Sequence, residues 1–182
     1  MKELGDREII DKVLAGNHEL FGVIIDRYER PVAAVIRGLL GNCPEAEEVG
    51  QDAFIKCFQS LGKFRGDSTL KTYIIRIALN LSLNELKRRK KELNRTILFN
   101  DAGQMTLFSE DRVQERNEMR DIINSALSRL EIRQREVIVL RIIEGYSTIE
   151  TAKILKVPVG TVLSRLSRAQ VNMRKLIGHN RF

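Results

Sequence analysis

Residues 147–169 read STIETAKILKVPVGTVLSRLSRA, and this stretch decides the fold. Apolar residues recur at spacings of three and four on both sides of Lys156-Val157-Pro158, which predicts two short helices separated by a turn. The turn is expected at this point because a proline pushes the residue before it out of the helical region. The small side chain of Ala152 lets the two helices cross closely. Together these features predict a helix-turn-helix.

The second of these helices carries the residue types that recognition in the DNA major groove requires. Arginine can bond guanine through two parallel hydrogen bonds, and serine or threonine can reach base edges or phosphates. Residues 119–182 carry 12 Lys/Arg against 5 Asp/Glu, and no acidic residue follows Glu150. An ordinary helical hairpin is the alternative, but the turn proline, the outward polar row and the missing acids favour double-stranded DNA as the partner. The candidate DNA-binding residues here are Arg141, Pro158, Gly160, Thr161, Ser164, Arg165 and Arg168.

The rest of the chain also has helical periodicity. Apolar spacing predicts helices over residues 6–16, 17–40, 44–61, 69–89, 113–130 and 133–144, with an interruption or kink at Pro31. The periodicity fades between residues 92 and 112, where Asn, Gly and Ser suggest a linker. We therefore expect an all-α protein of two small helical domains, residues 1–91 and 113–182, joined by a flexible linker over residues 92–112.

Composition excludes several classes of protein. The chain has 182 residues, a formal net charge of +7 and two cysteines, Cys43 and Cys57, with no Cys/His cluster that predicts a metal site or a disulfide framework. We expect Cys57 to be a small core residue. No apolar segment predicts membrane insertion or a secretion signal, so we expect a cytoplasmic protein. No nucleophile–base pair, phosphate-binding loop or cofactor motif is present, so we expect neither an enzyme nor a cofactor.

Two stretches of the N-terminal half carry further candidate residues. AEEVGQDAF at residues 46–54 places Gln51 and Asp52 on one helix face beside Phe54, which suits docking on another protein. The acidic cluster at residues 45–48, taken alone, fits a solvated helix face better. FRGDSTLKTYIIRIALN at residues 64–80 combines a loop with a helix on which Asn80 and Asn84 share a face. Such amides can bond the edge of an unstacked base, although surface or helix-bonded amides are the alternative.

These strings, in this order, resemble extracytoplasmic-function (ECF) sigma factors, the small two-domain promoter-specificity subunits of bacterial RNA polymerase. PVGTVLSR at residues 158–165 resembles their region 4, and residues 46–54 resemble their region 2.2. The resemblance implies that the helix-turn-helix binds the −35 element of promoter DNA. It implies contact with the β and β' subunits of core RNA polymerase through Glu48, Gln51, Asp52 and Phe54. Gly50 stands where the family has a larger apolar residue.

Residues 64–80 resemble the segment with which this family recognises and melts the −10 element. The resemblance implies that this surface binds the melted non-template strand and that an anti-sigma protein masks the polymerase- and DNA-binding faces. The run Lys87–Lys91 could follow phosphates, although a solvated helix end fits equally well. The residues implied for the −10 element are Phe64, Arg65, Gly66, Asp67, Ser68, Arg76, Asn80, Asn84, Lys87 and Arg88.

A second function class stays open at this point. An autonomous regulator that binds its operator as a dimer through a helix-turn-helix would share the C-terminal motif. It would explain neither the strings of the N-terminal half nor the linker.

Overall fold

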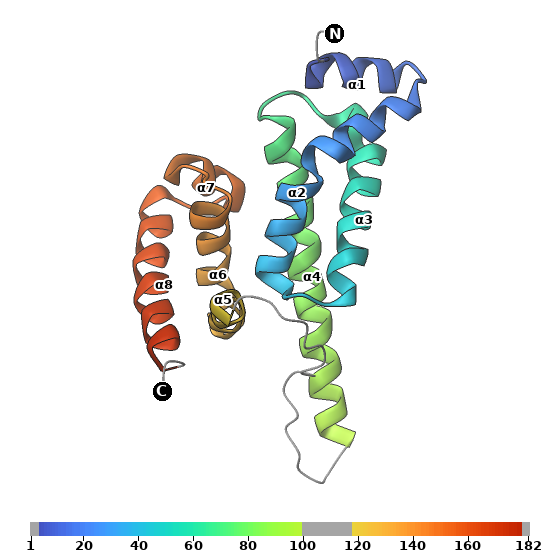
Figure 1. The fold of residues 1–182 in the computed structure, drawn as a ribbon. Helices are drawn as coiled ribbons and strands as arrows, with labels where there is room; N and C mark the ends of the chain where they lie inside the picture. Colours follow the sequence, from blue (N-terminus) through green and yellow to red (C-terminus); the bar gives the residue numbers. More distant parts are fainter. Residues whose placement is uncertain (1–3, 100–117, 180–182) are drawn as a thin grey trace.

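The computed structural model describes residues 4–99 and 118–179, and every regular element within these ranges is a helix (Figure 1). The expectation of an all-α protein is therefore confirmed. Within the same ranges, no helix is both long and apolar enough to cross a bilayer.

The N-terminal half packs its helices around an apolar core. Pro44 takes the first position of its helix, and the preceding Cys43 is extended at φ −140° and ψ 159°, as a residue before proline should be. Cys57 is fully buried, which confirms it as a core residue, and burial raises the pKa of its thiol to about 12. The elements are α1 (Asp6–Leu14), η1 (His18–Leu20), α2 (Phe21–Leu40), α3 (Pro44–Ser60), η2 (Leu61–Lys63) and α4 (Leu70–Phe99).

Two helices in this half differ from the prediction. Helix α2 continues through Pro31, so the proline does not interrupt it, and Val32 and Val35 after it are buried in the core; the alternative, a kink at Pro31, stays a prediction. Helix α4 continues to Phe99 instead of ending near Arg89. Its last turns leave the core, so they lose apolar periodicity but keep good helix formers and an i,i+4 ion pair between Arg88 and Glu92. The rest of the expected linker, residues 100–112, lies outside the described residues.

The C-terminal half comprises shorter helices with two small apolar clusters of their own. In one cluster, Ile138 and Ala169 pack with Leu127 and Leu130. In the other, Ala152 packs with Val137 and Val162 where the two helices of the helix-turn-helix cross. The elements are α5 (Glu118–Arg129), α6 (Ile132–Ile138), the π-helical turn η3 (Val139–Ile143), α7 (Thr148–Leu155) and α8 (Val159–His179).

The two halves also share a core. Val139, Leu140, Tyr146 and Ile154 of the C-terminal half belong to the main apolar cluster of the N-terminal half. Helix α2 contacts α5, α6 and η3, and α4 contacts α7, so the C-terminal helices lie along one side of the N-terminal bundle (Figure 1). Sequence periodicity predicted the helices of each half but not this contact between the halves.

Candidate nucleic-acid interface

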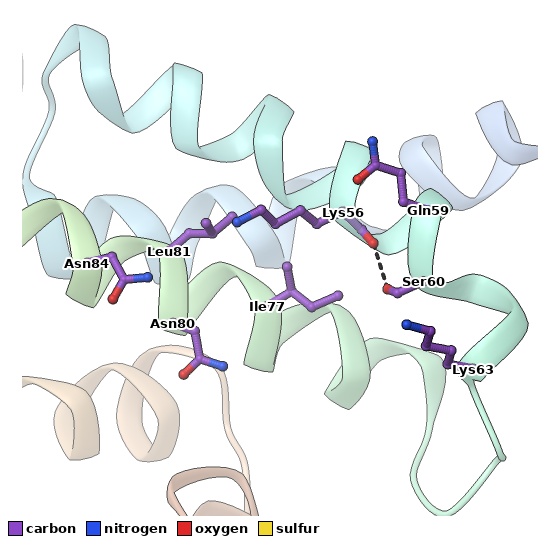
Figure 2. Close-up of a pocket in the computed structure, with 8 residues that line it drawn as sticks. All are labelled: Lys56, Gln59, Ser60, Lys63, Ile77, Asn80, Leu81 and Asn84. Atoms are coloured by element: carbon purple, nitrogen blue, oxygen red, sulfur yellow. Dashed lines mark hydrogen bonds between the residues drawn. The ribbon is translucent and has the colours of Figure 1, made fainter.

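A surface pocket of about 430 Å³ lies between α3 and α4 (Figure 2). Asn80 and Asn84, which share one face of α4 as predicted, form one side of it. The α3 side supplies two lysines and a glutamine, and Ile77 and Leu81 supply apolar surface. The lining residues are Lys56, Gln59, Ser60, Lys63, Ile77, Asn80, Leu81 and Asn84.

The α3 side of this pocket was missed in the sequence. Lys56, Gln59, Ser60 and Lys63 follow one another at spacings of three, one and three, so they lie on one side of α3 and η2. Ser60 is held in place, because its hydroxyl donates to the Lys56 carbonyl at 2.6 Å (Figure 2) and accepts from the Tyr73 hydroxyl at 2.7 Å. Helical spacing indicates that these polar residues share one side of α3 and η2, but only the packing of α3 on α4 shows that this side borders the pocket.

The loop from Phe64 to Ser68 follows directly after the pocket residue Lys63. Phe64 is half-buried and packs against the Tyr73 ring, with 5.1 Å between the ring centroids. Gly66 has φ +80°, a left-handed conformation that favours glycine. The loop is therefore anchored by Phe64, while the side chains of Arg65 and Asp67 are exposed to solvent.

This pocket has the chemistry of a nucleobase site. Amide groups can donate to and accept from a base edge, while aliphatic side chains contact the base face. Lysine ammonium groups at the pocket can neutralise the phosphates on either side of the base.

Two arginines on α4 that the sequence predicted for this surface, Arg76 and Arg88, have partners within the protein. A terminal nitrogen of Arg76 donates to the Lys153 carbonyl at 3.2 Å, and Arg76 is half-buried. Arg88 contacts both Glu85 and Glu92 at 2.8 Å, which lowers the pKa of Glu85. Lys87 is exposed.

The second candidate surface is on α3. Glu48, Gln51 and Asp52 are all exposed, as docking would require. Phe54 is only 9% exposed and belongs to the core, so it offers less anchorage than its place in the sequence suggested. Its ring borders a pocket of about 400 Å³ between α2 and α3, which Gly50 and Gln51 also line.

Two local features define the start and the end of α7, the first helix of the helix-turn-helix. Ser147 and Glu150 form a reciprocal capping box at the start of α7, and this contact lowers the pKa of Glu150. Lys156 ends the helix in the left-handed conformation at φ 54°, before Val157 and Pro158. Helix α8 can therefore start in a new direction immediately after the turn.

Helix α8 presents most of its predicted residues outward. Gly160, Ser164 and Arg168 are exposed, as is Pro158 before the helix, while Thr161 and Arg165 are half-buried. Arg141 lies apart from this row, because it is half-buried and donates to the Tyr146 carbonyl in the α6–α7 turn. In this structure Arg141 supports the turn that precedes the helix-turn-helix.

Comparisons with known proteins agree with this layout. The sigma-70 region 2 family matches residues 24–92, and the sigma-70 region 4 family matches residues 120–171. The ECF RNA polymerase sigma-E factor of Escherichia coli K12 is 32% identical, over 93% of this chain and 92% of its own. The ECF RNA polymerase sigma factor SigW of Bacillus subtilis is 30% identical, over 95% of this chain and 97% of its own.

Two solved structures share the fold along most of the chain. CnrH, solved in complex with the cytosolic domain of CnrY, superimposes with a TM-score of 0.69 and 25% identity, over 96% of this chain and 97% of its own. The sigma factor RpoE of Bartonella quintana, solved with the anti-sigma factor NepR, gives a TM-score of 0.68 and 25% identity, over 88% of this chain and 98% of its own.

Proposed function

Because the chain belongs to the ECF family of RNA polymerase sigma factors, we propose that it guides core RNA polymerase to promoters through three separate surfaces. The exposed face of α3 docks on the polymerase, α8 reads the −35 element, and the pocket between α3 and α4 captures a base of the −10 element. The observation that carries the proposal is this pocket, in which Asn80, Asn84 and two lysines converge within the region 2 match.

The −10 pocket acts by binding a base that has left the stack. Unstacking and unpairing a base costs a few kcal/mol, so a pocket that binds the flipped base stabilises the melted promoter. The asparagine amides bond the base edge, and Lys56 and Lys63 contact the adjacent phosphates of the non-template strand. The loop Phe64–Ser68 holds the strand where it enters the pocket.

The −35 surface is the exposed row of α8. A recognition helix reads base edges with its N-terminal residues, and Gly160 lets backbone come close to the DNA there. Ser164 and Arg168 lie one and two turns further along and are exposed. Arginine contacts to guanine then specify sequence, and the acid-free C-terminal part of the chain adds affinity for phosphates.

The polymerase surface is the polar face of α3. Gln51 and Asp52 make hydrogen bonds with the β and β' subunits, and the adjoining pocket beside Gly50 receives an apolar side chain of that partner. The chain thereby contributes recognition, and the polymerase contributes catalysis in the cytoplasm. An anti-sigma protein that covers these surfaces would regulate this chain, as the related complexes with NepR and CnrY suggest.

Run-off transcription tests the proposal. Purified chain is added to core RNA polymerase on fragmented genomic DNA, and the start sites are mapped. We expect specific starts preceded by two common elements, and co-elution of the chain with core polymerase in gel filtration. An autonomous operator-binding regulator would neither co-elute nor give new starts.

A further inference from the structure

The first two turns of α8 expose few polar groups that can distinguish one base pair from another. Gly160 has no side chain, and Thr161 and Arg165 are half-buried. The Ser164 hydroxyl donates to the Thr161 carbonyl at 3.1 Å, so its proton is used within the helix and its oxygen can only accept. Discrimination between bases at this end of α8 therefore calls for a side chain beyond those that the sequence singled out.

Leu163 is the largest side chain that is exposed in these two turns. It is 52% exposed, and Val159, four residues before it, is 43% exposed. Residues four apart are neighbours on a helix surface, so the two form an apolar strip. Val162 and Leu166 already supply the inner apolar face of α8, because Val162 is fully buried and Leu166 packs against both small clusters. The strip of Val159 and Leu163 is additional to that face, and the described part of the protein leaves it open to solvent.

This strip borders the row of α8 that faces DNA in the proposed function. Successive residues of a helix are rotated by about 100°, which places Leu163 on one flank of the row Gly160–Ser164 and Arg168 on the other. The strip also lies within the region 4 match, residues 120–171. No acidic residue follows Glu150, so α8 brings no negative side chain that would repel a phosphate beside the strip. The apolar strip is therefore continuous with the −35 surface, and the edge of a base pair can cover it.

Thymine is the base that suits an apolar side chain in the major groove. It carries a C5-methyl group there, whereas the edges of the other three bases are recognised through hydrogen bonds. Leucine can make no hydrogen bond, but it gains by removing a methyl group from water. We propose that Leu163, supported by Val159, contacts the methyl group of a thymine in the −35 element and makes that position specific for thymine. This inference rests on the proposed function, because it names the base that the same surface recognises.

Replacing thymine by uracil tests the methyl contact directly. Uracil keeps the base-pairing edge and the O4 acceptor of thymine and lacks only the C5-methyl group. Each thymine of a −35 element mapped by run-off transcription is exchanged in turn in a duplex promoter fragment, and competition binding gives the affinity of the holoenzyme. We expect one exchange to weaken binding of the wild type about fourfold, which corresponds to the burial of one methyl group.

Variants of α8 assign this contact to a residue. Leu163→Ala should bind the thymine and uracil fragments equally well at that position. Leu163→Met keeps an apolar side chain of similar volume and should retain most of the thymine preference. Val171→Ala is the matched control, because Val171 is an apolar residue on the same helix, 45% exposed and about two turns further along. It should retain the whole preference at that position.

Three results would overturn the proposal. The first is that no thymine of the element is sensitive to loss of its methyl group. The second is that Leu163→Ala weakens binding of the thymine and uracil fragments equally and so keeps the preference, which would mean that this side chain serves another contact. The third is that Val159→Ala abolishes the preference while Leu163→Ala keeps it, which would assign the methyl contact to Val159.

Failure of this inference differs from failure of the proposed function. If only the inference is wrong, the wild-type holoenzyme still prefers the mapped promoter fragment to a duplex with a scrambled −35 element. If the wild type shows no such preference, the proposed reading of the −35 element by α8 is wrong, and the inference falls with it.

Discussion

The Arg135 guanidinium donates a hydrogen bond of 2.6 Å to the Leu39 carbonyl oxygen, across 96 positions of sequence. The same guanidinium bonds the carbonyls of Ser128 and Leu130 at the end of α5. Burial lowers the pKa of Arg135, because the charged form loses water. The carbonyls that replace this water belong to helix ends, which carry partial negative charge. One buried cation thus joins the C-terminal ends of α2 and α5.

Arg135→Met should lower the free energy of unfolding by about 3 kcal/mol, because it leaves several buried carbonyls without a donor. Chemical denaturation measures the change. Arg133→Met, on the same helix but exposed, is the control and should change stability by less than about 0.5 kcal/mol. Equal effects of the two variants would show that the contact with Leu39 is not stabilising.

Asp52→Ala should weaken binding to core RNA polymerase about tenfold or more, because it removes an exposed carboxylate from the centre of the docking face. Interferometry with immobilised core polymerase gives the affinity. Asp11→Ala provides the control. Asp11 is exposed on α1, away from α3, and forms an ion pair with Arg7 one turn earlier on the same helix. If Asp52→Ala and Gln51→Ala both bind like the wild type, the docking face lies elsewhere.

Asn80→Ala should reduce the affinity of the holoenzyme for a −10 non-template oligonucleotide about tenfold, which corresponds to about 1.4 kcal/mol. The physical reason is the loss of hydrogen bonds to the captured base. Asn94→Ala, exposed further along the same helix and outside the pocket, should leave the affinity unchanged. A similar loss for both variants would point to a general effect on α4 and against base capture.

Arg168→Ala should weaken the binding free energy for the −35 element by about 1–3 kcal/mol. It should also reduce the discrimination between bases at one position of that element. Competition binding with a set of single-base promoter variants resolves the position. Arg174→Ala, further along α8, should weaken binding by the same factor for every sequence. An unchanged base preference in Arg168→Ala would remove this residue from the reading set.

Glu136→Gln should make stability less dependent on pH. Burial raises the pKa of Glu136, because its carboxylate is desolvated, and the nearby Arg165 and Arg133 offset this only in part. A carboxyl whose folded pKa lies above its unfolded value of about 4.3 contributes stability at low pH that is lost as the pH rises through the folded pKa. As the pH rises from about 4.3 through the folded pKa of Glu136, the wild type should therefore lose stability relative to Glu136→Gln.

Denaturation curves at a series of pH values measure this difference. Glu131→Gln, at an exposed position just before α6, controls for the loss of one negative charge. Parallel pH profiles for the wild type and Glu136→Gln would contradict the prediction.

Local sequence predicted the helical class and the helix-turn-helix because the interactions responsible span only a few residues. The capping box of Ser147 and Glu150 and the break before Pro158 act within one turn of chain. Periodicity failed for the last part of α4, since it reports burial and residues 90–95 are exposed. It also missed Lys56 and Lys63, because only the packing of α3 on α4 shows that they border the same pocket as Asn80.

The amino-acid sequence by itself determined which segments are helical, where the second helix of the helix-turn-helix begins, and which polar residues share a helix face. These properties follow from backbone preferences and from contacts at spacings of three and four residues. Only the tertiary structure decided that Arg135 reaches Leu39, that Lys71 meets Glu144, and that Gly38 admits Val139. Such pairs are separated by long stretches of chain, so their proximity depends on how whole helices pack and no local pattern encodes it.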